Sequence, residues 1–98
     1  MSLWKREFPD FVGEVKELEG FVDSSWHNDQ SPSISFWLDV DNDHRIVVWF
    51  IDEREVEWEG CRYMVQGPIP EDGITHTCNT WDEVLALDLF NTFQFWTR

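Results

Sequence analysis

The fold of this chain is constrained most by one uninterrupted apolar run, Ile46-Val47-Val48-Trp49-Phe50-Ile51. Its β-branched and aromatic residues favour a strand. A strand that is apolar at every position buries both of its faces, so we expect residues 45–51 to lie at the centre of a sheet. The preceding segment, 33–40, is apolar at its even positions and carries serine or aspartate at 33, 35 and 39. This alternation predicts a neighbouring strand, joined to the central one by a turn at 41–44.

Helices are predicted near both ends of the chain. Apolar side chains recur within residues 8–18 at the spacing of one helical stripe, which predicts a first helix. Thr80 and Glu83 form a capping-box pattern, which predicts the start of a second helix that runs to Asn91. Residues 92–97 are predicted to form either a last strand or a continuation of that helix.

A β-hairpin is predicted between residues 56 and 65, with a two-residue turn at Glu59 and Gly60. This register places Glu57 opposite Arg62, a favourable cross-strand charge pair. The glycines and prolines of residues 66–73 predict a loop after the hairpin.

These segments predict one globular domain over residues 1–98. The chain has 42% hydrophobic residues, enough for a core, and it contains no internal repeat or long linker. With a further short strand at 74–79, the predicted fold class is α+β. We expect an antiparallel β-meander of about four to five strands with an N-terminal and a C-terminal helix.

The charge of the chain restricts its partners. Twenty Asp and Glu face seven Lys and Arg, which gives a formal net charge of −13. Phosphates would be repelled by this charge, so direct nucleic-acid binding is not expected, whereas a basic protein would be attracted. No segment has the length of apolar sequence that a membrane span needs, and the first residues do not form a signal peptide. We therefore expect a cytoplasmic protein that does not bind membranes.

The acidic residues are densest between positions 52 and 59. One explanation is a solvated strand edge whose charges prevent edge-to-edge pairing. The other is a docking surface that steers a basic partner, with the tryptophan in this segment as an anchor. The candidate partner-binding residues are Asp52, Glu53, Glu55, Glu57, Trp58 and Glu59.

The aromatic content allows two further interpretations. Seven Trp and eight Phe exceed what a core of this size readily buries. As an alternative to partner docking, Trp37, Trp49 and Tyr63 could line a small-ligand pocket between the sheet and a helix. A sheet face left uncovered by the helices could instead form a homodimer. A domain with no assignable activity also remains open.

No enzymatic activity, cofactor or metal is expected from the sequence. It contains neither a nucleophile-elbow motif nor a glycine-rich phosphate loop. The acidic pattern at 39–43 resembles a calcium loop, but His44 stands where glycine is required and Phe50 where a bidentate Glu is required. We interpret this pattern as a turn. Cys61 and Cys78 are expected to be two buried free thiols.

Overall fold

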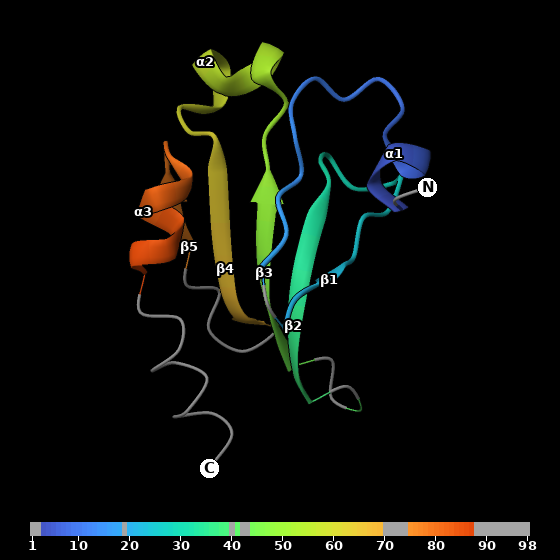
Figure 1. Ribbon diagram of the computed structural model, residues 1–98, viewed down its shortest axis with the longest axis vertical. Coiled ribbons are helices and arrows are strands. Elements are labelled where there is room, and N and C mark those ends of the chain that lie inside the picture. Colours follow the sequence, from blue (N-terminus) through green and yellow to red (C-terminus); the bar gives the residue numbers. More distant parts are fainter. Residues whose placement is uncertain (1–2, 19, 40, 42–43, 70–74, 88–98) are drawn as a thin grey trace.

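The computed structural model describes residues 3–18, 20–39, 41, 44–69 and 75–87, and the strands in these ranges form one five-stranded antiparallel sheet (Figure 1). The order of the strands in the sheet, β1-β2-β3-β4-β5, is also their order along the chain. The predicted α+β class and antiparallel meander are therefore confirmed. The elements are α1 (Leu3–Glu7), β1 (Val22–Asp23), β2 (Ser33–Asp39), β3 (His44–Phe50), η1 (Glu53–Glu55), α2 (Val56–Glu59), β4 (Tyr63–Ile69), β5 (Thr75–Cys78) and α3 (Trp81–Ala86).

The apolar run forms the central strand, as predicted. β3 pairs with β2 on one side and with β4 on the other, so that Val48 lies between Ile34 and Val65. All three side chains are buried on the same face of the sheet. The fully buried core also includes Ile46, Phe50, Cys78 and Val84.

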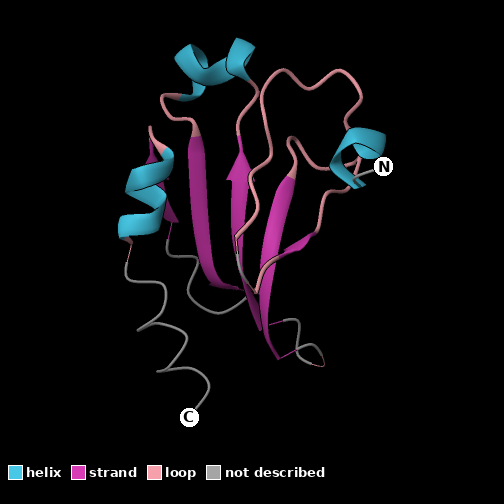
Figure 2. Cartoon of the chain, in the orientation of Figure 1, coloured by secondary structure: helices cyan, strands magenta, loops and turns pink. Residues whose placement is uncertain are grey.

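The chain between α1 and β1 covers this core face without being helical (Figure 2). The helix predicted over residues 8–18 is wrong, because α1 ends at Glu7 and Gly13 has a φ of 140°, outside the helical region. Phe11, Val15 and Leu18 nevertheless pack against the core. The periodicity of the apolar residues thus correctly indicated which side chains contact the sheet, but it did not indicate the backbone conformation of the segment.

The hairpin predicted between residues 56 and 65 is also wrong. Residues 53–59 form η1 and α2, and β4 begins at Tyr63 and pairs with β3 and β5 instead. Gly60 does adopt the positive φ expected of it, at 80°, but as the left-handed cap of α2 rather than in a hairpin turn. The predicted pairing of Glu57 with Arg62 is therefore not formed.

The loop predicted over residues 66–73 is wrong in its first half, because β4 continues to Ile69. A bulge explains why the glycine and proline there are compatible with a strand. Arg45 pairs with Ile69 and Val47 with Gln66, so Gly67 and Pro68 together oppose the single residue Ile46. Residues 70–74 lie outside the described residues.

The beginning of the second helix is where the sequence places it. Thr80 is the N-cap of α3, and its hydroxyl oxygen accepts a hydrogen bond from the Glu83 amide at 3.1 Å. The Glu83 carboxylate accepts from the backbone amide of Asn79, one residue before the cap, at 3.1 Å. The strand predicted at 74–79 is confirmed as β5. The predictions for residues 88–91 and 92–97 lie outside the described residues.

Replacing Thr80 with alanine should lower the free energy of unfolding by about 0.5–2 kcal/mol, because the Glu83 amide loses its acceptor. The loss can be measured by urea denaturation. Thr77→Ala on β5 is a matched control, since this exposed threonine is not a cap. Equal losses in the two variants would contradict a specific role for the cap.

Candidate partner-binding site

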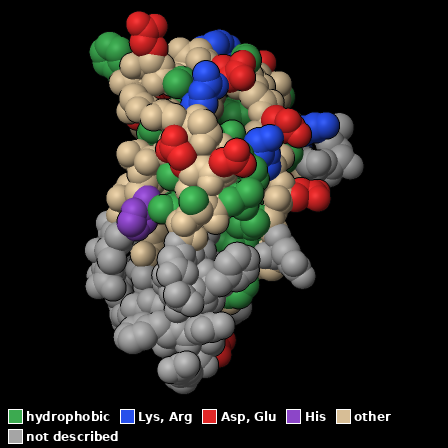
Figure 3. All heavy atoms as spheres, turned by 60° about the vertical axis from the view of Figure 1, so that its left-hand side comes forward, with side chains coloured by type: hydrophobic (Ala, Val, Ile, Leu, Met, Phe, Trp, Pro, Cys, Tyr) green, Lys and Arg blue, Asp and Glu red, His purple; other side chains and the backbone are tan. Residues whose placement is uncertain are grey.

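The most exposed large hydrophobic side chain of the described residues belongs to Trp58, with 90% of its surface accessible. It lies on α2, which projects beyond the ends of β3 and β4 (Figure 1). Hydrophobic and acidic side chains lie next to one another at this end of the molecule (Figure 3). We call the exposed side chains of this region the η1–α2 surface; they are Glu53, Glu55, Glu57, Trp58 and Glu59.

Asp52, the sixth predicted partner-binding residue, has a structural role. Its carboxylate forms an ion pair with Arg54 at 2.6 Å and also accepts hydrogen bonds from the backbone amides of Arg54 and Val12, at 2.8 and 3.1 Å. The pKa of the Asp52 carboxyl lies well below its usual range, chiefly because the Arg54 side chain donates hydrogen bonds to it. Asp52 is thus already engaged within the chain, and its part in partner binding stays a prediction.

The contacts of Asp52 belong to a set that ties the η1–α2 surface to the N-terminal segment. Arg54 Nη2 donates a hydrogen bond to the carbonyl oxygen of Asp10 at 2.7 Å. The backbone amide of Glu53 donates to the carbonyl oxygen of Val12 at 2.8 Å. On the far side, the Gly60 amide closes α2 by donating to the Val56 carbonyl oxygen at 2.8 Å. These bonds hold the single-turn helix in place, so its exposed side chains are presented from a fixed backbone.

The residues of the predicted aromatic pocket are not brought together. Tyr63 pairs with Phe50 on the core face, where its ring contacts those of Phe50 and Trp81. The register of β2 and β3 places Trp37 and Trp49 on the opposite face of the sheet. Trp37 packs there under the Arg45 guanidinium, whose carbon lies 5.1 Å from the ring centroid. The predicted grouping of Trp37, Trp49 and Tyr63 is therefore wrong.

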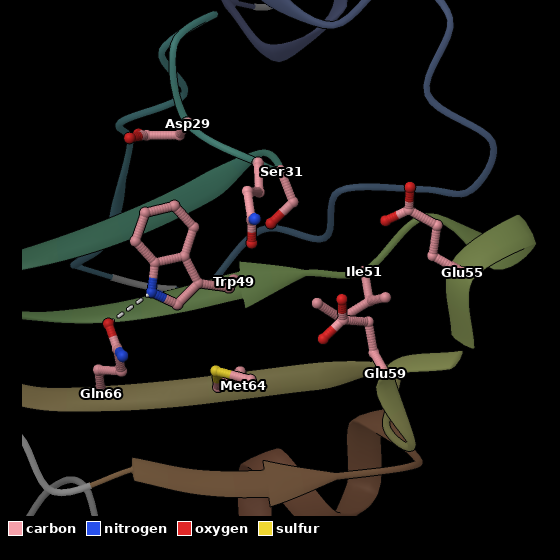
Figure 4. A pocket seen from close by; sticks show the side chains of 9 residues that line it. Asp29, Ser31, Trp49, Ile51, Glu55, Glu59, Met64 and Gln66 are labelled. Carbon is pink, nitrogen blue, oxygen red and sulfur yellow. Dashed lines mark hydrogen bonds between the residues drawn. The ribbon is translucent and has the colours of Figure 1, made fainter. Parts of the chain in front are cut away.

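Of these three residues, Trp49 lines a pocket of about 280 Å³ (Figure 4), whereas Tyr63 borders a much smaller one of about 40 Å³. The larger pocket lies between β3, β4, the η1–α2 surface and the loop before β2. Its lining residues are Asp29, Gln30, Ser31, Trp49, Ile51, Glu55, Glu59, Met64 and Gln66. Sequence reasoning missed most of this set because the residues come from separate segments. The sequence signal that was available was a tryptophan on a central strand.

The two cysteines are buried free thiols, as expected. Burial raises the pKa of both, and the negative charge of Glu59 adds to the effect on Cys61. Raised thiol pKa values disfavour the reactive thiolate, so neither cysteine has the character of a nucleophile. Among the described residues there is no group of three or more His, Cys, Asp and Glu side chains placed to hold a metal ion.

Comparisons of the chain with protein-family models, with curated proteins and with solved structures gave no match. The arguments about function therefore rest on the residues and their geometry. None of the helices in the described ranges has the length and apolarity required to cross a bilayer.

Proposed function

We propose that this chain is a small acidic, non-enzymatic interaction protein that docks a basic protein partner, acting as an inhibitor, an immunity factor or a charge mimic. The observation that carries the proposal is the 90% exposure of Trp58 among exposed glutamates. The proposed setting is the cytoplasm, an expectation that comes from the sequence.

The exposure of Trp58 is informative because the fold does not use this side chain. Tryptophan is among the residues enriched at the energetic centres of protein interfaces, where its large apolar surface is buried by the partner. The hydrogen bonds around Asp52 and Gly60 fix the backbone that presents it. A pre-organised surface loses less conformational entropy on binding than a flexible one, which favours affinity.

The charge of the η1–α2 surface determines the chemistry of the partner. Glu53, Glu55, Glu57 and Glu59 lie within five positions of Trp58 in the sequence, and Arg54 between them is already paired with Asp52. A negative surface accelerates association with a positive one and repels phosphates. This favours a basic protein over a nucleic acid.

Two variants should weaken partner capture in different ways. Glu53→Lys/Glu57→Lys should slow association by about tenfold or more at low salt, because it reverses two steering charges. The loss should shrink as salt shortens the Debye length from about 10 Å at 0.1 M to about 3 Å at 1 M. Trp58→Ala should mainly accelerate dissociation, because it removes the anchor.

The measurement is comparative capture from a lysate of the source cell, followed by stopped-flow kinetics with the purified partner over a salt series. Glu17→Lys/Asp41→Lys is the matched control, since it reverses two exposed charges, neither of which borders a cavity lined by η1 or α2. A genuine partner is lost with both η1–α2 variants and retained by the control. If every captured protein responds equally to the control, binding is non-specific and the proposal is wrong.

A homodimer through the sheet face that carries Trp37 and Trp49 stays a prediction of the sequence. The described helix α3 and the segment of residues 8–21 pack against the other face, the one that holds the core. The face with Trp37 and Trp49 is not bare, however, since Ser35 and Val47 on it are fully buried within the chain.

A further inference from the structure

The pocket beside α2 combines an apolar floor with a negative rim. Trp49 and Met64 lie on adjacent strands and border the pocket, together with Ile51 (Figure 4). Asp29 lies at one side of the pocket, and Glu55 and Glu59 lie at the side nearest η1 and α2. The described lining contains three carboxylates and neither Lys nor Arg, so the pocket attracts a cation.

The orientation of the Trp49 ring is fixed by a hydrogen bond at its edge. The indole Nε1 donates to Gln66 Oε1 at 2.8 Å, between neighbouring strands (Figure 4). This bond satisfies the indole N–H, the single polar group of the side chain. A ligand in the pocket would therefore contact Trp49 through the π-face of the ring. A cation over such a face is attracted by the ring quadrupole, most strongly for tryptophan.

The size of the pocket selects a small ligand. Pockets that hold drug-sized molecules typically measure about 300–1,000 Å³, and this one has a volume of about 280 Å³. It suits one long side chain rather than a nucleotide or an extended peptide. Two of its three carboxylates, those of Glu55 and Glu59, also belong to the η1–α2 surface.

We propose that this pocket binds the guanidinium group of an arginine side chain that the basic partner presents next to its contact with Trp58. The identity of the ligand rests on the proposed function, because the arginine is assigned to that partner. A guanidinium is planar and delocalised, so it can stack on the indole of Trp49 while the carboxylates of the pocket lining, those of Asp29, Glu55 and Glu59, balance its positive charge. A lysine ammonium is a compact, strongly hydrated charge that cannot do both equally well.

Titration of the isolated protein with N-acetyl-arginine amide tests the pocket without the partner. In ¹⁵N–¹H spectra we expect a saturable shift of the Trp49 indole N–H signal, identified by its loss in Trp49→Phe, and of the Gln66 side-chain amide. The affinity for blocked arginine should exceed that for N-acetyl-lysine amide by about fivefold or more. Glu55→Gln/Glu59→Gln should weaken binding by about tenfold, because it removes two of the three carboxylates that line the pocket.

The matched control is Glu53→Gln/Glu57→Gln, which removes the same charge from the same surface but outside the pocket lining. It should leave the affinity for blocked arginine within about twofold of the unmodified protein, because Glu53 and Glu57 do not line the pocket and solvent screens their charge from it. An absence of saturable shifts, equal affinity for blocked lysine, or an equal loss in the control would each overturn the proposal.

The outcome separates this inference from the proposed function. Trp58→Ala should not change the affinity for blocked arginine, because Trp58 does not line the pocket. If blocked arginine fails to bind while partner capture still depends on Trp58, the pocket assignment is wrong and the docking surface stands. If blocked arginine binds but no captured protein depends on Trp58, the pocket is a cation site and the docking function is wrong.

Discussion

Replacing Phe50 with alanine is expected to lower the free energy of unfolding by about 3–5 kcal/mol. Phe50 is 1% exposed and occupies the centre of an aromatic cluster. Its ring meets that of Tyr63 edge-on and stacks against Trp81 of α3, with centroid distances of 5.8 Å in both cases. Alanine would leave a cavity and remove both ring contacts, one of which joins α3 to the sheet. For a domain whose total stability is about 5–15 kcal/mol, this loss is a large fraction.

The measurement is the midpoint of urea denaturation, with Trp58→Ala as a matched control. Both substitutions truncate a large aromatic side chain, but Trp58 is 90% exposed and should change stability by no more than about 0.5 kcal/mol. Comparable destabilisation by the two substitutions would contradict the assignment of Phe50 to the core and Trp58 to the surface.

Gly67→Ala is expected to cost about 2–3 kcal/mol, the second largest effect, because overpacking adds to backbone strain. Gly67 has a φ of 156° and lies in the bulge opposite Ile46. A Cβ atom there would lie 2.9 Å from the Ile46 Cα and 2.8 Å from its Cγ1. The backbone of β3 cannot move away easily, because β3 is paired on both sides.

Gly60→Ala separates the two causes. Gly60 also has a positive φ, at 80°, but a Cβ atom there would meet nothing within 4 Å. We expect a loss of about 1 kcal/mol from the backbone conformation alone, again measured by urea denaturation. Equal losses at the two positions would show that the close approach to Ile46 does not contribute.

The strands β2 and β3 and the start of α3 could be predicted from the sequence because their signals are local. The alternation around Ile34 and Phe36 defines a one-sided strand, and the run from Ile46 to Ile51 defines the central one. The capping of α3 by Thr80 depends on residues three apart in the chain. These features need no knowledge of distant contacts.

The incorrect predictions share a different cause. A stripe such as Phe11, Val15 and Leu18 can belong to a helix or to an irregular segment pressed onto a sheet, and only the local φ angles distinguish the two. The conformation of residues 53–59 depends on contacts of Asp52 and Arg54 with residues 10–12, about forty positions earlier in the chain. No pattern within a short window encodes such contacts.

The candidate site was partly predictable for the same reason. The glutamates between Glu53 and Glu59 and the proposed anchor Trp58 lie in one short stretch of the chain, so the sequence alone identifies them as a group. The pocket joins Asp29, Trp49 and Met64, which come together only through the pairing of β3 with β4 and the path of the loop before β2. That grouping follows from tertiary structure.

The lengths of the outer strands have a consequence for aggregation and for the way partners bind. Within the described residues the meander ends in β1, with two residues, and in β5, with four, so each outermost strand is short. Long, flat edges are the templates on which sheets join edge to edge or capture an extended peptide as an extra strand. Short outermost strands give such a partner few backbone groups to pair with, which favours recognition through side-chain contacts at α2 over strand addition to β1 or β5.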